Sequence, residues 1–316
     1  MTTLLYYDEL FSQHATGRHP ECSARTERIW QHLMAAGLDR ACVRPSWEPV
    51  SLADLQRIHR PDYLRRLQDY VAQGGGRIEV DTVVSPRSYE VAVRAAGAAC
   101  DAVRRVVSGE ACHALCLIRP PGHHARRHAA MGFCLINHVA VAARMATESL
   151  QVNRTLIVDW DVHHGNGTQE IFWEDERTAL FSIHRWPFYP GTGAASETGQ
   201  AAGLGTTRNV PVEFGTSRRD YFAKFEQSLT EFAQRTKPEL ILLSAGFDAH
   251  RLDPVGSLGL ETEDFARLTQ FVRQIADSYC GGRIVSLLEG GYNLDLLPQC
   301  VEQHLRELLR PDEMRR

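Results

Sequence analysis

The chain has 316 residues, of which 43% are hydrophobic, and its formal net charge is −4. This composition is ample for a large core, and the slightly negative net charge does not indicate nucleic-acid binding. No apolar stretch approaches the length that spans a bilayer, and the N-terminus lacks the basic and apolar regions of a signal peptide. Eight cysteines without paired spacing indicate reduced thiols. We therefore expect a single cytoplasmic domain over residues 1–316, with no nucleic-acid or membrane partner, and the sequence leaves a homo-oligomer open.

Short apolar runs alternate with helical segments along the chain. The runs cover residues 114–118, 155–158, 180–183, 240–243 and 284–288. Because they lack polar alternation, they predict strands of a parallel sheet that is buried on both faces. Apolar residues at helical spacing occupy the intervals 87–107, 137–145, 221–235 and 265–279. Strands that alternate with helices predict an α/β fold, and the long polar stretch 187–208 predicts a loop.

Polar residues follow every predicted strand, and the densest group follows the second. Asp159, Asp161 and His163 are spaced two apart, so they project to the same face where that strand ends. Two carboxylates and one imidazole form a partial shell for a divalent metal. In open α/β sheets, ligands bind beyond the carboxyl ends of the strands. The sequence therefore predicts one composite site. The other groups at strand ends are His123 and His124, His184, Asp248 and His250, and Glu289 and Tyr292.

Seven motifs in order carry a family resemblance. They are HPECSAR (19–25), RPPGHHA (119–125), GFCLIN (132–137), VDWDVHHGNGT (158–168), YPGTG (189–193), SAGFDAHRLDPVG (244–256) and EGGYN (289–293). This series resembles the zinc-dependent histone deacetylases and related amidohydrolases. The resemblance implies the three-layer α/β/α arginase–deacetylase fold, with a mainly parallel sheet of about eight strands. It also implies a catalytic domain that removes acetyl or other acyl groups from lysine side chains or similar amines by metal-activated water.

The resemblance assigns one zinc ion to Asp161, His163 and Asp248. Two carboxylates and one imidazole leave open positions for water and a substrate carbonyl, as a catalytic zinc site requires. The anionic ligands partly neutralise the metal, so the bound water is less acidified and a protein base becomes more valuable. Ferrous iron is the alternative metal in the cell.

The resemblance also assigns the catalytic residues. His123 and His124 match the tandem catalytic histidines, and Asp159 matches the acid that orients His123. Asn166 occupies a position that is an aspartate in some relatives and an asparagine in the class II branch. Since an amide supports a protonated imidazole less well than a carboxylate does, we expect His124 to be the general base and His123 an electrostatic partner. Tyr292 matches the tyrosine that donates to the oxyanion of the tetrahedral intermediate.

The expected substrate-binding residues surround a narrow tunnel. Phe133 and Tyr189 match the aromatic walls of the acyl-lysine tunnel, and Asp81 matches a rim residue that binds the substrate backbone. Val255 lies at the rim. Gly132 and Gly291 complete the set, and Gly291 lets the chain turn tightly enough to deliver Tyr292.

Potassium is a further cofactor of the family. The resemblance puts one ion near the zinc, at Asp159, Asp161, the carbonyl of His163 and the region of Ser182. It puts a second ion near Phe172 and Thr178.

Three alternatives remain beside the acyl-lysine hydrolase. A binuclear manganese hydrolase of the arginase type needs acids where this chain has Gly165 and His250. An acylpolyamine deacetylase carries an acid just after the Asp-Pro pair, where this chain has the apolar Val255. A non-catalytic binding module with the same fold is disfavoured by the complete set of ligands, bases and tyrosine.

Overall fold

The computed structural model describes residues 2–311, and its centre is a parallel sheet of seven strands. The strand order is β1-β4-β9-β8-β5-β6-β7, and every neighbouring pair is parallel. The sheet has seven strands where about eight were expected. The strands are β1 (Thr3–Tyr6), β4 (His113–Cys116), β5 (Thr155–Asp159), β6 (Thr178–Arg185), β7 (Thr207–Val212), β8 (Leu240–Ala245) and β9 (Ile284–Leu288).

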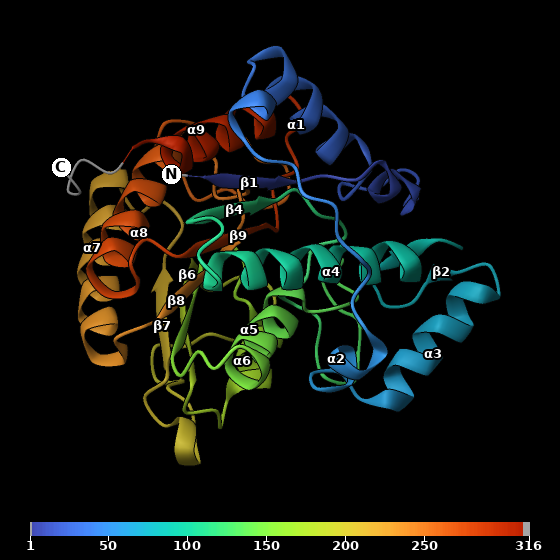
Figure 1. Cartoon of the computed structure of the whole chain (residues 1–316), viewed down its shortest axis with the longest axis horizontal. Helices are drawn as coiled ribbons and strands as arrows, with labels where there is room; N and C mark the ends of the chain where they lie inside the picture. The colour runs from blue at the N-terminus through green and yellow to red at the C-terminus, as the bar shows by residue number, and fades with distance from the viewer. Residues whose placement is uncertain (1, 312–316) are drawn as a thin grey trace.

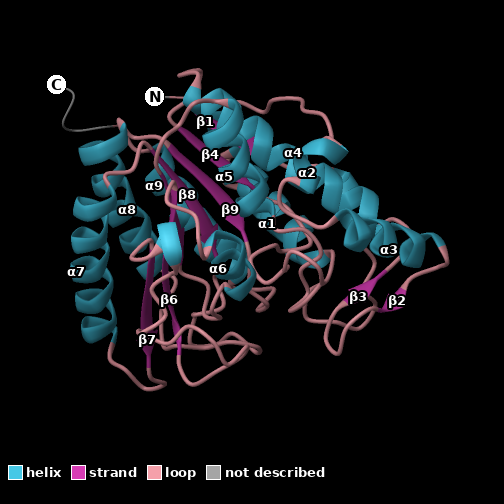
Figure 2. Cartoon of the chain, turned by 90° about the horizontal axis from the view of Figure 1, so that it is seen from below, coloured by secondary structure: helices cyan, strands magenta, loops and turns pink. Residues whose placement is uncertain are grey.

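Helices cover both faces of this sheet, so the fold is the expected three-layer α/β/α sandwich (Figures 1 and 2). The helices α3, α4 and α5 pack with one face, and α1, α7, α8 and α9 pack with the other. The helices are α1 (Ala24–Ala35), α2 (Leu52–Gln56), α3 (Pro61–Ala72), α4 (Ser88–Val107), α5 (His138–Ser149), α6 (Asn166–Phe172), α7 (Arg218–Thr236), α8 (Asp264–Cys280) and α9 (Leu297–Leu309). A small hairpin of β2 (Gly76–Arg77) and β3 (Val83–Val84) lies apart from the sheet.

Side chains along each strand alternate between two hydrophobic cores. In β8, Leu240 and Leu242 join the core under α4 and α5, whereas Ile241 and Leu243 join the core under α7, α8 and α9. Because successive strand residues point to opposite faces, a strand that is apolar at every position has helices on both sides. This is why the five central runs read as continuous apolar segments.

All five predicted strands and all four predicted helices are confirmed within a few residues of their expected bounds. The structure adds the edge strands β1 and β7, which the sequence analysis did not predict. β7 begins at Thr207, inside the stretch 187–208 that was expected to be a loop throughout. The rest of that stretch is irregular except for a short 3-10 helix at Ala201–Gly203.

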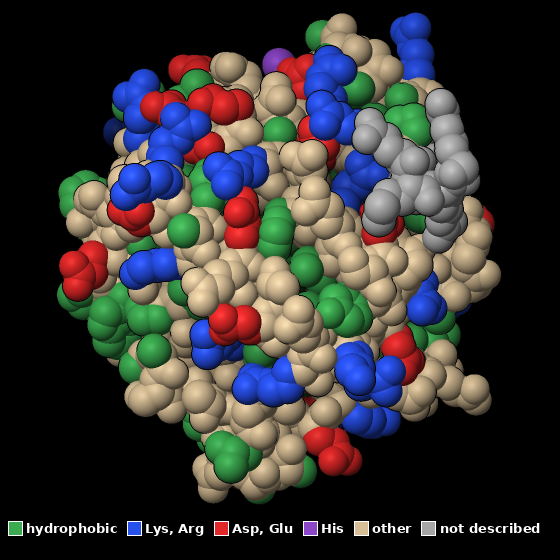
Figure 3. All heavy atoms as spheres, turned by 90° about the vertical axis from the view of Figure 1, so that its left-hand side faces the viewer, with side chains coloured by type: hydrophobic (Ala, Val, Ile, Leu, Met, Phe, Trp, Pro, Cys, Tyr) green, Lys and Arg blue, Asp and Glu red, His purple; other side chains and the backbone are tan. Residues whose placement is uncertain are grey.

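Charged side chains are spread over the face of the molecule at α7. Figure 3 shows the face on the α7 side of the molecule, where basic and acidic side chains are interspersed. None of the helices in the described part of the chain combines the length and the apolar character needed to span a bilayer.

Buried histidines make the fold sensitive to acid. His59 is 1% exposed; its Nδ1 lies 3.0 Å from the Arg126 carbonyl oxygen, and its Nε2 accepts from the Asn137 N–H at 3.0 Å. Burial lowers the pKa of His59 to about 4, despite the hydrogen bond to Arg126. Burial likewise lowers the pKa values of His138, His184 and His304 to about 4, 3 and 3. The native state therefore holds these rings neutral.

We expect the free energy of unfolding to fall as the pH drops from about 6.5 towards 4. Over that window the unfolded chain binds protons that native His59 does not, which removes about 2 kcal/mol by pH 5 from His59 alone. Urea unfolding at pH 7.5 and pH 5, in chelator, measures this loss. His59→Gln should reduce the difference between the two pH values. His128→Gln, at a half-exposed ring, should leave it unchanged. An equal pH difference in wild type and His59→Gln would contradict the assignment.

Candidate active site

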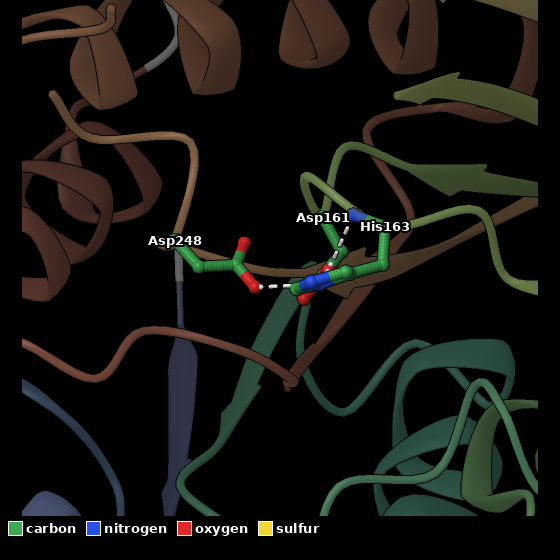
Figure 4. Close-up of side chains that lie close together, drawn as sticks. All are labelled: Asp161, His163 and Asp248. Carbon is green, nitrogen blue, oxygen red and sulfur yellow. Dashed lines mark hydrogen bonds and ion pairs between the residues drawn. The ribbon is translucent and has the colours of Figure 1, made fainter. Parts of the chain in front are cut away.

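Three buried side chains from two neighbouring strand ends converge at the carboxyl edge of the sheet. Asp161 and His163 lie in the loop after β5, and Asp248 lies in the loop after β8 (Figure 4). His163 Nδ1 is 3.0 Å from Asp161 Oδ1 and 3.1 Å from Asp248 Oδ2. One ligand atom from each residue lies within 4.8 Å of the others, and the side chains are almost fully buried. This cluster is able to hold a metal ion.

The two carboxylates of the cluster, Asp161 and Asp248, would be stabilised by a bound cation. Burial and the neighbouring Asp161 carboxylate raise the pKa of Asp248 to about 7, because two carboxylates without water repel each other. The second oxygen of each acid is already occupied by the backbone. Gly290 N–H donates to Asp161 Oδ2 at 2.8 Å, and Val162 N–H donates to Asp248 Oδ1 at 2.9 Å. These bonds direct Asp161 Oδ1 and Asp248 Oδ2 toward His163, where both could bind a borderline divalent metal, and Asp161 Oδ1 also accepts from the His163 backbone N–H at 2.9 Å.

The tandem histidines lie beside this cluster, each with a different partner. His123 Nδ1 is 3.0 Å from Asp159 Oδ2, and His124 Nδ1 is 2.7 Å from Asn166 Oδ1. Burial opposes charge on His123, but the carboxylates of Asp159 and Asp161 outweigh it and raise its pKa to about 10. Burial and the neighbouring His123 and His163 hold the pKa of His124 well below its usual value. These directions favour a charged His123 and a neutral His124.

A pocket of about 210 Å³ leads to these groups. It is lined by Asp81, His124, Gly132, Phe133, His163, Phe188, Tyr189, Val255 and Tyr292. The rings of Phe133 and Tyr292 meet edge to face at 5.7 Å, and Tyr189 meets His124 edge to face at 5.3 Å. The structure thus brings every site residue predicted from the sequence to one region. Five of the six expected substrate-binding residues line the pocket, namely Asp81, Gly132, Phe133, Tyr189 and Val255, and Gly291 does not. The catalytic candidates His124 and Tyr292 also line it.

Backbone geometry explains why glycine occupies positions 132 and 291. Gly132 has φ +55°, and a Cβ atom there would lie 2.4 Å from the His124 ring. Gly291 has φ +122°, and its Cβ would meet Leu297 at 2.6 Å. Any side chain would displace a neighbour at either position. Gly132 forms part of the pocket wall, whereas Gly291 sets the path of the chain into Tyr292.

The rim segments are fixed by polar contacts. The Thr82 hydroxyl donates to Asp81 Oδ1 at 2.9 Å and accepts from the Phe133 N–H at 3.0 Å. On another rim segment, Asp253 Oδ1 accepts from the Val255 N–H at 2.9 Å, and its Oδ2 accepts from the Tyr292 N–H at 2.7 Å. Asp253 therefore fixes Val255 and Tyr292 together.

Two buried titratable side chains behind the site, Glu289 and Arg25, had no role predicted from the sequence. Glu289 Oε2 accepts from the backbone N–H groups of Gly122 and His123, at 2.7 and 3.1 Å, and so holds the histidine loop. The Arg25 Nε–H donates to the Gly291 carbonyl at 2.6 Å, and its guanidinium lies 4.8 Å from the centre of the Tyr292 ring. An acid at a strand end was a visible signal for Glu289. Arg25 has one local partner, Glu21 Oε1 at 3.3 Å, but the Gly291 and Glu289 carbonyls that it contacts at the site lie more than 260 positions away, and no local pattern indicates them.

Comparison with known proteins identifies the family. The model of the histone deacetylase domain matches residues 19–308. The chain belongs to the histone deacetylase family. It is 35% identical to a histone deacetylase-like amidohydrolase of Pseudomonas aeruginosa, over 97% of this chain and 86% of the relative. It is 37% identical to the human polyamine deacetylase HDAC10 over 98% of this chain, which spans about half (48%) of that longer protein.

Structural comparison confirms the fold of this family member. The solved structure of the HDA15 HD domain superposes with a TM-score of 0.92 at 34% identity, covering 99% of this chain and 90% of that one. The expected arginase–deacetylase fold is therefore correct. The chain is a hydrolase of the deacetylase and amidohydrolase type.

Proposed function

We propose that this family member is a zinc-dependent deacylase that hydrolyses acetyl or other acyl groups from lysine side chains. The observation that carries the proposal is the narrow pocket, whose aromatic walls lead to His124, His163 and Tyr292. A slender methylene chain suits flat walls, and an amide at its tip would reach the polar end of the pocket. One zinc ion is proposed at Asp161, His163 and Asp248. When bound there, it would polarise the amide carbonyl and acidify a water molecule.

Three side chains near the substrate amide have separate proposed roles in the reaction. The hydrogen bond between His124 Nδ1 and Asn166 Oδ1 requires Nδ1 to carry the proton, since an amide oxygen only accepts. Nε2 of His124 is then free to accept a proton from water, and the neutral ring makes His124 the proposed base. His123 stays charged beside Asp159 and stabilises negative charge that develops on the substrate. Tyr292 would donate its hydroxyl hydrogen to the oxyanion.

Burial keeps the Tyr292 hydroxyl protonated. Burial first, and then the charges of Asp248 and Asp161, raise the pKa of Tyr292 well above its usual value, although Arg25 opposes them. A phenol that remains protonated at neutral pH is a competent hydrogen-bond donor. Potassium at Asp159, Asp161, the His163 carbonyl and Ser182, and at Phe172 and Thr178, remains part of the proposal, as do a cytoplasmic location and homo-oligomer formation.

The test of the proposed function is a substrate comparison with purified, zinc-loaded protein. Acetyl-lysine peptides, longer acyl-lysine peptides and acetylated polyamines are compared by kcat/KM. We expect the acyl-lysine peptides to be the better substrates. An absence of turnover on all three classes, with zinc bound, would overturn the proposal.

An acetylpolyamine deacetylase is the second candidate. It is favoured by the similarity to human HDAC10, whose name states that activity, and by the Asp81 carboxylate on the pocket lining. It is disfavoured by Val255, an apolar side chain on the same pocket. Acyl-lysine therefore remains the preferred substrate class, and Val255 becomes the residue to test.

Val255→Glu is expected to move selectivity toward acetylated polyamines. A partly buried carboxylate at the pocket would pair with the distal ammonium of the polyamine and disfavour an uncharged chain. We expect the ratio of kcat/KM for acetylspermidine to that for an acetyl-lysine peptide to rise by roughly tenfold, which corresponds to about 1.4 kcal/mol. Val43→Glu, at an exposed valine outside this pocket, adds the same charge and should leave the ratio unchanged. A large polyamine preference in the wild type would contradict our interpretation of the rim.

A further inference from the structure

Arg185, the last residue of β6, lies directly behind the pocket wall. Its backbone N–H donates to the Val162 carbonyl at 2.9 Å, next to His163. Its guanidinium lies between two aromatic rings, 4.1 Å from the centre of Phe188 and 4.4 Å from the centre of Phe214. Phe214 is 65% exposed, so it covers the outer side of the guanidinium toward solvent. Stacking on both sides restricts where the Phe188 ring can lie.

Phe188 connects this stack to the site. Its ring lies nearly parallel to the His163 imidazole, with centroids 5.2 Å apart and an interplanar angle of 18°. Phe188 also lines the pocket. The four groups therefore form one continuous stack, which runs from His163 through Phe188 and Arg185 to the exposed Phe214.

Arg185 also contacts the rim segment that follows Val255. Its Nη1 donates to the carbonyl oxygens of Gly256 and Ser257, at 3.1 and 3.4 Å. These residues directly follow Val255, which lines the same pocket as Phe188. Ser257 has φ +73°, an uncommon conformation for a residue with a side chain, and its N–H donates to the Asp248 carbonyl at 2.7 Å. One side chain thus joins the Phe188 wall, the Val255 segment and the backbone of Asp248.

We propose that Arg185 is a positioning residue that sets the width of the acyl pocket by holding Phe188 and the Val255–Ser257 segment at a fixed separation. The proposal rests on the proposed deacylase function, because it assigns selectivity to that pocket. Arg185 does not line the pocket, so it acts through Phe188 and Val255. A planar guanidinium both stacks on two rings and donates in its own plane, which an ammonium group cannot do.

Kinetics of Arg185 variants test the proposal. Arg185→Met keeps an unbranched stem of about the length of the aliphatic part of arginine and removes the stacking cation and its donors. We expect KM for an acetyl-lysine peptide to rise roughly tenfold while kcat changes less than about threefold, because substrate placement is lost and the reacting groups remain. The difference in kcat/KM between acetyl-lysine peptides and longer acyl-lysine peptides should become smaller. Arg185→Lys should recover little of the wild-type KM and selectivity, since a lysine keeps only the positive charge.

Arg267→Met is the matched control. Arg267 in α8 also stacks on an aromatic ring, with its guanidinium 4.1 Å from the centre of Phe222, but Phe222, unlike Phe188, does not line the pocket. The KM and the selectivity of Arg267→Met should match those of the wild type. Wild-type KM and selectivity in folded Arg185→Met, or full recovery in Arg185→Lys, would overturn the proposal. A fall in kcat at unchanged KM would overturn it as well.

Hydrogen exchange tests the positioning role without any substrate. In the free protein, Arg185→Met should exchange faster at residues 186–193 and 254–258, and Arg267→Met should not. Unchanged exchange in both segments would overturn the positioning role even if the deacylase function holds. Faster exchange in a chain that hydrolyses no acyl amide would instead retain the positioning role and reject the proposed function.

Discussion

Asp248→Ala is expected to abolish metal binding and turnover together. Asp248 is the proposed ligand from the loop after β8, and its removal leaves Asp161 and His163, which are too few for a stable site in the presence of competing water. Elemental analysis of the wild type should give about one transition metal per chain, with zinc the expected metal. The variant should give almost none, and its kcat should fall below detection. Two equivalents of manganese in the wild type would contradict the mononuclear site.

Thermal unfolding separates loss of the metal from loss of the fold. A bound metal stabilises only the native state, so a chelator should lower the Tm of the wild type. The same chelator should leave the Tm of Asp248→Ala unchanged. Asp264→Ala is the matched control, because Asp264 is another buried acid, and it pairs with Arg218 away from the cluster. That control should retain its metal, even if its stability falls. A chelator-sensitive Tm in Asp248→Ala would show that the metal binds elsewhere.

Tyr292→Phe is expected to lower kcat by roughly 10²–10³ while KM changes little. That range is typical for removal of one oxyanion donor, and it corresponds to about 2.7–4 kcal/mol of transition-state stabilisation. The ring contacts with Phe133 and Arg25 should persist, because only the hydroxyl is removed. Steady-state kinetics and elemental analysis measure the two effects, and the metal content should be unchanged.

Tyr63→Phe provides the matched control for this loss. The Tyr63 hydroxyl is also buried and donates to the Leu135 carbonyl at 2.7 Å, but it does not line the pocket. Its removal should cost about 1 kcal/mol of stability and leave kcat within about threefold. If Tyr292→Phe retains wild-type kcat, the oxyanion donor lies elsewhere, and His123 and His124 become the next candidates.

The sequence predicted the centre of the sheet better than its edges. Strands buried on both faces must be apolar at every position, so β4, β5, β6, β8 and β9 were visible as continuous runs. β1 and β7 are the edge strands of the sheet; β7 pairs with β6, and β1 pairs with β4 and through an isolated bridge with Val43. β7 includes Thr207, Arg208 and Asn209, and such polar positions resemble a loop when they are read in isolation.

Local spacing and the order of the motifs sufficed to predict the main site residues. Asp159, Asp161 and His163 lie at one strand end, and the rule that parallel strands present their carboxyl ends at one edge brought Asp248, His123 and Tyr292 to the same place. The family match over residues 19–308 agrees with that prediction of the family.

Only the tertiary structure decided which distant side chains support the site. Arg25 contacts a carbonyl 266 positions away, and Arg185 joins Phe188 to a segment about 70 positions beyond it. Such contacts depend on how loops from different strands pack at one edge, and neither residue carries a periodicity or a spacing that reveals its partner. The chemistry of the site was thus determined by residues at strand ends, which local pattern reveals. The shape of the pocket was decided by long-range packing and hydrogen bonds, which exist only after the sheet has formed.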